Sequence, residues 1–161
     1  MSSLNAWCCS RALSIRSAVV LVWMVTSLRC VDVELETGTM VGARASAEEG
    51  ARLYHQRFNE RRFSDILDGA HPAFKASASR DQIIERMRED RNSLGSVVGT
   101  EEAGASCTPF QVTLVLYSKY EKSDFTEFFL FRIRGARADL LRFERTEGLI
   151  ASGLDASKKC P

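Results

Sequence analysis

The chain has 161 residues, of which 45% are hydrophobic and 27% are charged. This composition is typical of a globular protein and excludes a largely disordered one, and the length allows one domain with an appendage. The formal net charge of +1 argues against a dedicated nucleic-acid-binding protein, which would carry a strong excess of basic residues.

The N-terminal region has the charge and hydropathy pattern of a secretory signal. No acidic residue occurs before Asp32, and Arg11 and Arg16 precede an apolar run, AVVLVWMV, at residues 18–25. A helix of about eleven residues that begins with this run would rise roughly 16 Å, about half of a bilayer core, which is too short for a membrane anchor. We therefore expect residues 1–27 to be a signal peptide and the protein to be periplasmic or secreted. The alternative is a buried N-terminal helix of a cytosolic protein.

Cleavage of this signal after Ser27 would leave three of the five cysteines, namely Cys30, Cys107 and Cys160. Lipid attachment at Cys30 is not expected, because the bulky, charged Arg29 stands where a lipoprotein signal needs a small residue. In an oxidising compartment, three cysteines favour one disulfide and one remaining thiol. We expect the pair Cys107–Cys160, with three unpaired thiols as the alternative.

The first helix is expected after a linker. Residues 28–45 contain few large apolar side chains and carry Gly38 and Gly42, which is typical of a linker. SAEE, at residues 46–49, has the S-x-x-E form of a capping box and predicts a helix start. The apolar residues at helical spacing in this helix are Ala47, Ala51, Tyr54 and Phe58.

Two further helices are expected. RRFSDILDGA, at residues 61–70, carries apolar residues at helical spacing. SRDQ, at residues 79–82, has the form of a second capping box, and the helix that it starts is expected to end at Leu94, before Gly95.

The rest of the chain has the alternation of β-strands. Four strands are expected, at residues 96–102, 110–120, 124–134 and 139–145. The third is apolar on both faces near its middle, because Phe128 and Leu130 alternate with Phe129. This order predicts an α+β domain at residues 46–148, with three N-terminal helices packed on one face of a curved antiparallel sheet of about four strands. Residues 149–161 would form a C-terminal tail.

Two stretches carry a resemblance to a known superfamily. YHQRFNERRFSDILDGAHPAFK, at residues 54–75, offers a helix, a tight break and a second helix before an apolar anchor. IIERMREDRNSLGSVV, at residues 83–98, offers a charged helix that ends in Leu-Gly before a strand. On these features the chain resembles the nuclear transport factor 2-like superfamily, also called the cystatin-like roll. It is most similar there to small secreted bacterial proteins of the domain of unknown function 4019 family.

The resemblance implies a conical pocket between the sheet and the long helix, and an open sheet face that often forms dimers. Members that are enzymes, such as ketosteroid isomerase-like proteins, place a carboxylate in an apolar cavity. Glu127 is the candidate for that carboxylate, with Tyr54 as a candidate partner, because Glu127 shares a strand face with Phe129 and Phe131. The alternative, which we favour, places Glu127 in water near the strand end.

In that alternative, Glu127 lies opposite Lys119 or Lys122 across the hairpin.

His71 precedes Pro72 and is expected to be a turn residue. Residues 127–134, which include Arg132 and Arg134, could form an exposed sheet edge for a partner strand, although sheet core is the favoured interpretation.

The sequence contains no nucleotide-binding, metal-binding or catalytic motif, so no catalytic, cofactor-binding or metal site is expected. We expect an exported, non-enzymatic domain, without a membrane span after signal cleavage, that binds a small apolar ligand or a protein partner. The nine phenylalanines motivate the ligand, since they either fill a core or line a pocket, and a homodimer through the sheet face is the partner version. The alternative is an isomerase- or dehydratase-like enzyme that uses a carboxylate in the pocket.

Overall fold

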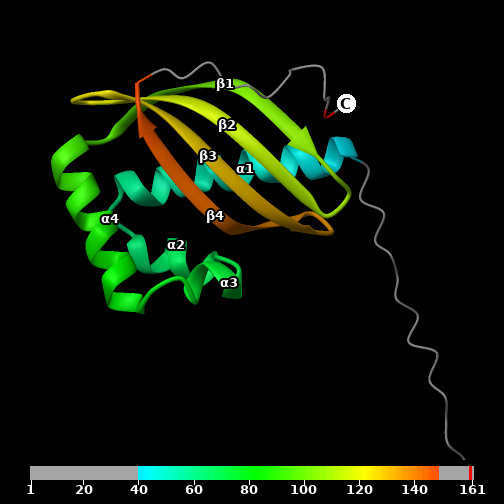
Figure 1. Ribbon diagram of the computed structural model, residues 1–161, viewed down its shortest axis with the longest axis horizontal. Helices are drawn as coiled ribbons and strands as arrows, with labels where there is room; N and C mark the ends of the chain where they lie inside the picture. The colour runs from blue at the N-terminus through cyan, green and yellow to red at the C-terminus, as the bar shows by residue number, and fades with distance from the viewer. Residues whose placement is uncertain (1–39, 149–159, 161) are drawn as a thin grey trace, which may run out of the picture. The chain divides into compact units, whose positions relative to one another are not determined.

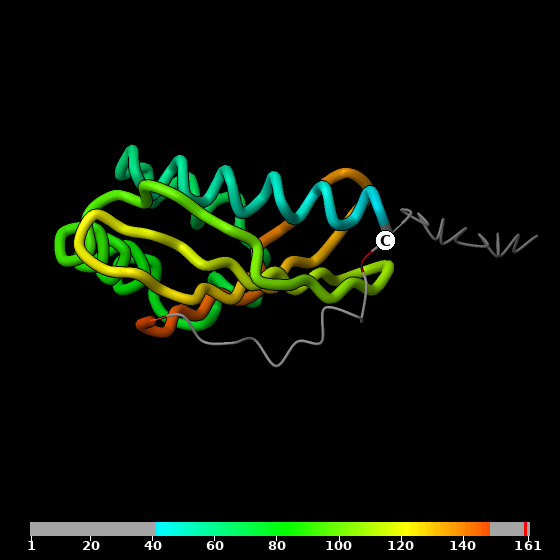
Figure 2. The backbone as a smooth tube through the Cα atoms, turned by 90° about the horizontal axis from the view of Figure 1, so that it is seen from above, coloured from blue at the N-terminus to red at the C-terminus, as the bar shows by residue number. Residues whose placement is uncertain are grey.

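The computed structural model of the protein describes residues 40–148 and residue 160. Its helices are α1 (Met40–Asn59), α2 (Phe63–Gly69), α3 (Pro72–Lys75) and α4 (Arg80–Leu94). Its strands are β1 (Val97–Cys107), β2 (Gln111–Tyr120), β3 (Asp124–Arg134) and β4 (Arg137–Glu147). Figure 1 shows the helices packed against the sheet, and Figure 2 shows α1 and the sheet as two layers. The predicted α+β class is thus confirmed.

The predicted signal peptide at residues 1–27 lies outside the described residues, as do Cys30, residues 28–39 of the predicted linker and nearly all of the predicted tail. Within the described part of the chain, no helix is long and apolar enough to cross a membrane.

The four strands form one sheet in the order β1-β2-β3-β4, and each strand pairs antiparallel with the next. In the middle of the sheet, Phe129 on β3 is paired with Leu114 on β2 and with Phe143 on β4. Residues paired in register point to the same face, so these three side chains form one row beneath α1. Leu114 and Phe129 are fully buried, because α1 and its neighbours cover this face.

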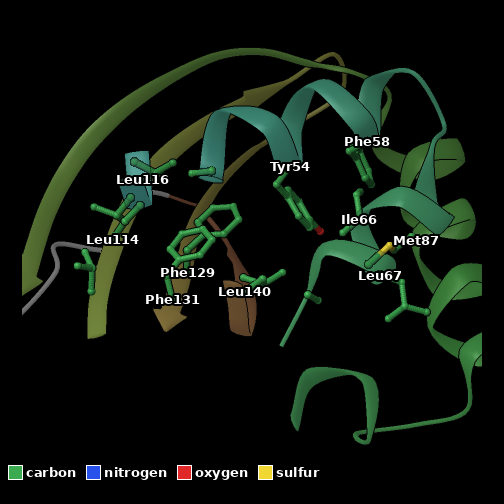
Figure 3. Close-up of a cluster of buried hydrophobic side chains, with 14 of the residues drawn as sticks. Tyr54, Phe58, Ile66, Leu67, Met87, Leu114, Leu116, Phe129, Phe131 and Leu140 are labelled. Atoms are coloured by element: carbon green, nitrogen blue, oxygen red, sulfur yellow. The ribbon is translucent and has the colours of Figure 1, made fainter. Parts of the chain in front are cut away.

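Helices and sheet share one apolar core, part of which Figure 3 shows. The labelled side chains of this core, each at most 9% exposed, are Tyr54, Phe58, Ile66, Leu67, Met87, Leu114, Leu116, Phe129, Phe131 and Leu140. Phe63 is also buried in it. Four phenylalanines therefore fill the core, namely Phe58, Phe63, Phe129 and Phe131. For these four, the core interpretation of the aromatic content holds and the pocket-lining interpretation does not.

The first helix begins earlier than predicted. α1 starts at Met40, and Ser46 lies inside it with its hydroxyl donating to the carbonyl of Gly42 at 2.9 Å. The predicted capping box at Ser46 is therefore wrong, and the last part of the predicted linker is helical. The physical reason is a stripe of buried alanines that continues upstream of Ala47 to Ala43, so packing against the sheet extends the helix beyond the local start signal.

Local signals decide the start and end of α4. Ser79 and Gln82 form the predicted capping box, and Gly95 follows the helix with a φ of 83° that favours glycine. A short helix that was not predicted, α3, begins at Pro72, where His71 accepts a hydrogen bond from the backbone N–H of Ala73 at 3.2 Å. His71, which was expected to be a turn residue, thus caps the start of α3.

The predicted disulfide Cys107–Cys160 is confirmed, with a Cα–Cα distance of 5.1 Å. It attaches residue 160 to the end of β1, which runs further than the predicted strand at 96–102. Arg44 of α1 lies close by, and its Nη1 donates to the carbonyl of Cys160 at 3.4 Å. The C-terminal cysteine is therefore held by both layers of the fold.

Candidate functional site

Glu127 is fully buried in the middle of β3, on the face that α1 covers. In the sheet register it lies between Leu116 on β2 and Arg145 on β4, whereas Lys119 is paired with Asp124. The favoured prediction of a solvated Glu127 opposite a lysine is therefore wrong. The strand bounds were predicted correctly, and the reason for the error is that α1 covers this face of β3 and brings His55 to the carboxylate.

Three donors surround the Glu127 carboxylate. Ser118 and Tyr120, two residues apart on β2, each donate a hydroxyl hydrogen bond at 2.5 Å, to Oε2 and Oε1 respectively. Nε2 of His55, on α1, lies 2.7 Å from Oε2. Burial raises the pKa of Glu127, but the hydrogen bonds from His55, Ser118 and Tyr120 outweigh it and hold the pKa below its ordinary value. Glu127 is therefore ionised at neutral pH.

The hydrogen bonds continue from Tyr120 to α4. Burial raises the pKa of Tyr120, and the nearby Glu127 charge adds to this, so the phenol keeps its proton and donates it. Nη1 of Arg145 in turn donates to the Tyr120 hydroxyl at 3.1 Å, and Nη2 lies 2.7 Å from a carboxylate oxygen of Asp90 on α4. We call His55–Glu127–Tyr120–Arg145–Asp90 the polar chain. It joins α1 to α4 through three strands.

Aromatic rings enclose the Arg145 guanidinium. Its central carbon lies 5.3 Å from the ring centre of Tyr120, 5.1 Å from that of Phe125 and 5.9 Å from that of Phe143. These distances are typical of cation–π contacts, which are stronger where water is excluded. Thus the Arg145 guanidinium is largely shielded from water, and it is linked to Glu127 through the Tyr120 hydroxyl.

At its other end the polar chain reaches a groove of about 390 Å³ between α1 and the first two strands. We call it the His55 groove. Its aliphatic lining residues are Ala51, Val97, Val98, Leu114 and Leu116. Its polar and charged lining residues are Glu48, Arg52, His55, Thr100 and Glu102. His55 is only 8% exposed and is the lining residue that is bonded to Glu127, so the groove meets the polar chain at this imidazole.

The other residues considered from the sequence lie elsewhere. Tyr54 does face inward, but it packs against Phe129 and Phe143, at ring-centre distances of 5.2 and 4.8 Å. Arg132 lies over the ring of Phe110 at 5.5 Å. None of these contacts involves the Glu127 carboxylate, which His55 approaches in place of Tyr54.

Two more of these residues have structural surroundings. Arg134 forms an ion pair with the buried Asp139, and Phe128 and Leu130 are half-buried on the outer face of the sheet. Among the described residues, no cluster of three or more His, Cys, Asp or Glu side chains could hold a metal ion.

Sequence reasoning missed most members of the site, namely His55, Asp90, Ser118, Tyr120 and Arg145. One signal was present: Ser118 and Glu127 are polar residues at inward positions of two neighbouring strands, where the alternation demands apolar ones. Such a pair indicates a buried polar cluster. His55 lies four residues after the buried Ala51, at helical spacing, and could have been assigned to the same face.

The fold and the site together define a small α+β domain with a buried, ionised glutamate bonded to a histidine beside an open groove. No protein-family model, no curated protein and no solved structure matches this chain. The likeness to the cystatin-like roll stays a prediction from the sequence.

Proposed function

We propose that the protein binds a small molecule in the His55 groove, with the apolar body of the ligand against the aliphatic lining and a polar end at His55. The observation that carries this proposal is the position of His55, a nearly buried imidazole held by an ionised carboxylate at the one place where the groove meets the polar chain. Ligand sites commonly combine a mainly apolar lining with a few polar groups in fixed orientations.

The size of the groove supports a small molecule rather than a protein segment. A volume of about 390 Å³ lies in the range of small-molecule sites, roughly 300–1,000 Å³. The buried charge of Glu127 supports a function beyond folding, because a buried charge is weak evidence for stability and perturbed ionisable groups cluster at functional sites. The groove therefore has both the space and the preorganised polar group that a ligand needs.

The binding proposal is favoured over an enzyme that uses the Glu127 carboxylate directly. Both oxygens of that carboxylate already accept hydrogen bonds, from Tyr120 at Oε1 and from Ser118 and His55 at Oε2. The groove lining includes His55 but not Glu127. A ligand in the groove would thus contact the imidazole and not the carboxylate, so we keep the non-enzymatic interpretation.

We also propose that the protein works outside the cytoplasm. The support is the Cys107–Cys160 disulfide together with the secretory pattern at residues 1–27. Disulfides persist in oxidising compartments and are rare in reducing ones.

The test is native mass spectrometry of the protein purified from its own host, in wild-type form and in two matched variants. Val98→Trp narrows the groove at its exposed rim. The control is Val41→Trp, at a valine of α1 outside the groove lining. The two valines are almost equally exposed, Val41 at 58% and Val98 at 57%. We expect an added small-molecule mass in the wild type and in Val41→Trp that is lost on denaturation, and its absence in Val98→Trp. Retention of the ligand in Val98→Trp, or a wild-type protein without ligand, would contradict the proposal.

A further inference from the structure

We propose that the ligand of the His55 groove presents a hydrogen-bond donor, such as a neutral alcohol, phenol or amine on an apolar body, and that Nδ1 of His55 is the acceptor that selects it. This inference rests on the proposed binding function and specifies the chemical class of the ligand.

The tautomer follows from the charge of Glu127. An ionised carboxylate can only accept hydrogen bonds, and Oε2 of Glu127 lies 2.7 Å from Nε2 of His55. Nε2 must therefore carry the hydrogen. In a neutral imidazole the other nitrogen, Nδ1, is then an acceptor with a free lone pair. The buried carboxylate thus decides which kind of hydrogen bond the groove offers.

The orientation of the imidazole is fixed before a ligand binds. The ring stands edge-on to Phe129, at 5.5 Å and 82°, and edge-on to Tyr54, at 5.8 Å and 76°. In the described part of the chain, the hydrogen-bond partner of the ring is Glu127, at Nε2, and no described residue bonds Nδ1. Binding would therefore cost little conformational entropy at this acceptor, which is the advantage of a preorganised site.

The rim of the groove also disfavours acceptors and anions. Glu48 and Glu102 both line it, and both are paired with Arg44, at 2.7 and 2.8 Å. The lining arginine, Arg52, forms a two-pronged ion pair with Glu49, at 2.6 Å for each bond. A ligand carboxylate would therefore meet two carboxylates of like charge and an arginine that is already paired. A ligand that donates a hydrogen bond would instead meet groups that accept one.

The test compares three probes that share a naphthalene ring and are substituted at the same position: naphthol, its methyl ether and naphthoate. Affinities are measured by calorimetry at neutral pH. We expect naphthol to bind about tenfold more tightly than the ether, the value of one net hydrogen bond, and naphthoate to bind most weakly. In Val98→Trp all three should lose affinity, whereas Val41→Trp should retain it. One outcome would overturn the donor assignment alone. In it, Val98→Trp still weakens the binding of all three probes, but the wild type binds naphthol and the ether equally or prefers naphthoate. Binding that Val98→Trp leaves unchanged would overturn the groove itself.

A variant assigns the preference to His55. His55→Phe removes the acceptor, so the affinities of naphthol and its ether should lie within about twofold of each other. The control is His71→Phe, at the only other histidine, which should keep the tenfold difference in affinity. Because His55→Phe removes a donor from a buried carboxylate, the wild-type ring is also examined directly. Nitrogen-15 shifts should show the hydrogen of neutral His55 on Nε2. A hydrogen on Nδ1 would overturn the proposal even if the variant does not fold.

Discussion

Nε2 of His55 on α1 and Oε2 of Glu127 on β3 lie 2.7 Å apart in the interior, although 72 residues separate them in the sequence. This contact joins the long helix to the middle of the sheet by a charge-assisted hydrogen bond, a stronger kind than a bond between neutral groups. It also places an oriented imidazole where the groove between α1 and the first two strands reaches the core. The same pair thus contributes to the fold and defines the candidate site.

Removal of the Glu127 carboxylate should strongly destabilise the fold. In Glu127→Leu the hydroxyls of Ser118 and Tyr120 and the N–H of His55 stay buried without their acceptor. We expect the free energy of unfolding in urea to fall by about 3–5 kcal/mol. The control Glu147→Leu, at an exposed position near the end of β4, should stay within about 0.5 kcal/mol of the wild type. A loss of less than 1 kcal/mol for Glu127→Leu would show that the carboxylate is not needed.

The pH dependence of stability should reveal the lowered pKa of Glu127. Its folded-state pKa lies below the ordinary value of 4.5, so ionised Glu127 stabilises the fold above that value. This contribution is lost as the pH falls from about 4.5 through the folded-state pKa. Other carboxylates also titrate there, so the quantity to measure is the difference between wild type and Glu127→Gln in urea unfolding from pH 7 to pH 3. The wild type should lose more stability than the variant, and parallel curves would contradict the prediction.

Arg145 should act as a unit with Asp90. The pair lies partly buried between β4 and α4, with side chains 11% and 34% exposed, and Arg145 also donates to Tyr120. We expect Arg145→Met to lower the free energy of unfolding by about 2 kcal/mol. This loss is smaller than for a fully buried pair, because Asp90 is partly solvated. Arg145→Lys should not restore it, because an ammonium group lacks the planar fork that makes both contacts.

A double-mutant cycle with Asp90→Asn measures the coupling of Arg145 to Asp90 directly. The cycle should give an interaction free energy of at least about 0.5 kcal/mol. Additive effects of the two substitutions would show that the ion pair does not hold α4 to the sheet.

The disulfide should stabilise the domain by restricting the unfolded chain. Cys107 and Cys160 are 53 residues apart, and a loop of that length corresponds to about 4 kcal/mol in the chain-entropy treatment. Cys107→Ser, Cys160→Ser and the double variant should each lose the same amount, because all three remove one bond. Unfolding of the wild type with and without a reductant measures the same quantity independently. Unequal single variants would mean that a thiol contributes by packing rather than through the bond.

Several features of the fold could be predicted because their signals are local. The capping box of Ser79 and Gln82 and the terminal Gly95 define α4 with little help from the rest of the chain. The alternation in residues 124–134 likewise put Glu127, Phe129 and Phe131 on one face of the strand, and all three are buried. The pair Cys107–Cys160 was expected, with unpaired thiols as the alternative, and the structure confirms the bond.

Other features depended on contacts between distant segments. The start of α1 moved from Ser46 to Met40 because buried Ala43 and Ala47 pack against the sheet, an effect that no local pattern at Ser46 reveals. The solvent exposure of Glu127 was predicted wrongly for a similar reason. Periodicity placed it on the inward face, but the favoured prediction treated it as a residue at a strand end.

By itself the sequence determined the alternation of the strands and where α4 begins and ends. It favoured the pair Cys107–Cys160 over unpaired thiols, and the structure decided for the bond. Only the tertiary structure decided that His55, Ser118 and Tyr120 converge on Glu127 and that the imidazole borders a groove. The physical reason is that periodicity specifies the direction of a side chain relative to its own element. The partner that it meets depends on how helix and sheet pack, and a buried charge is stable only where that packing brings enough donors to it.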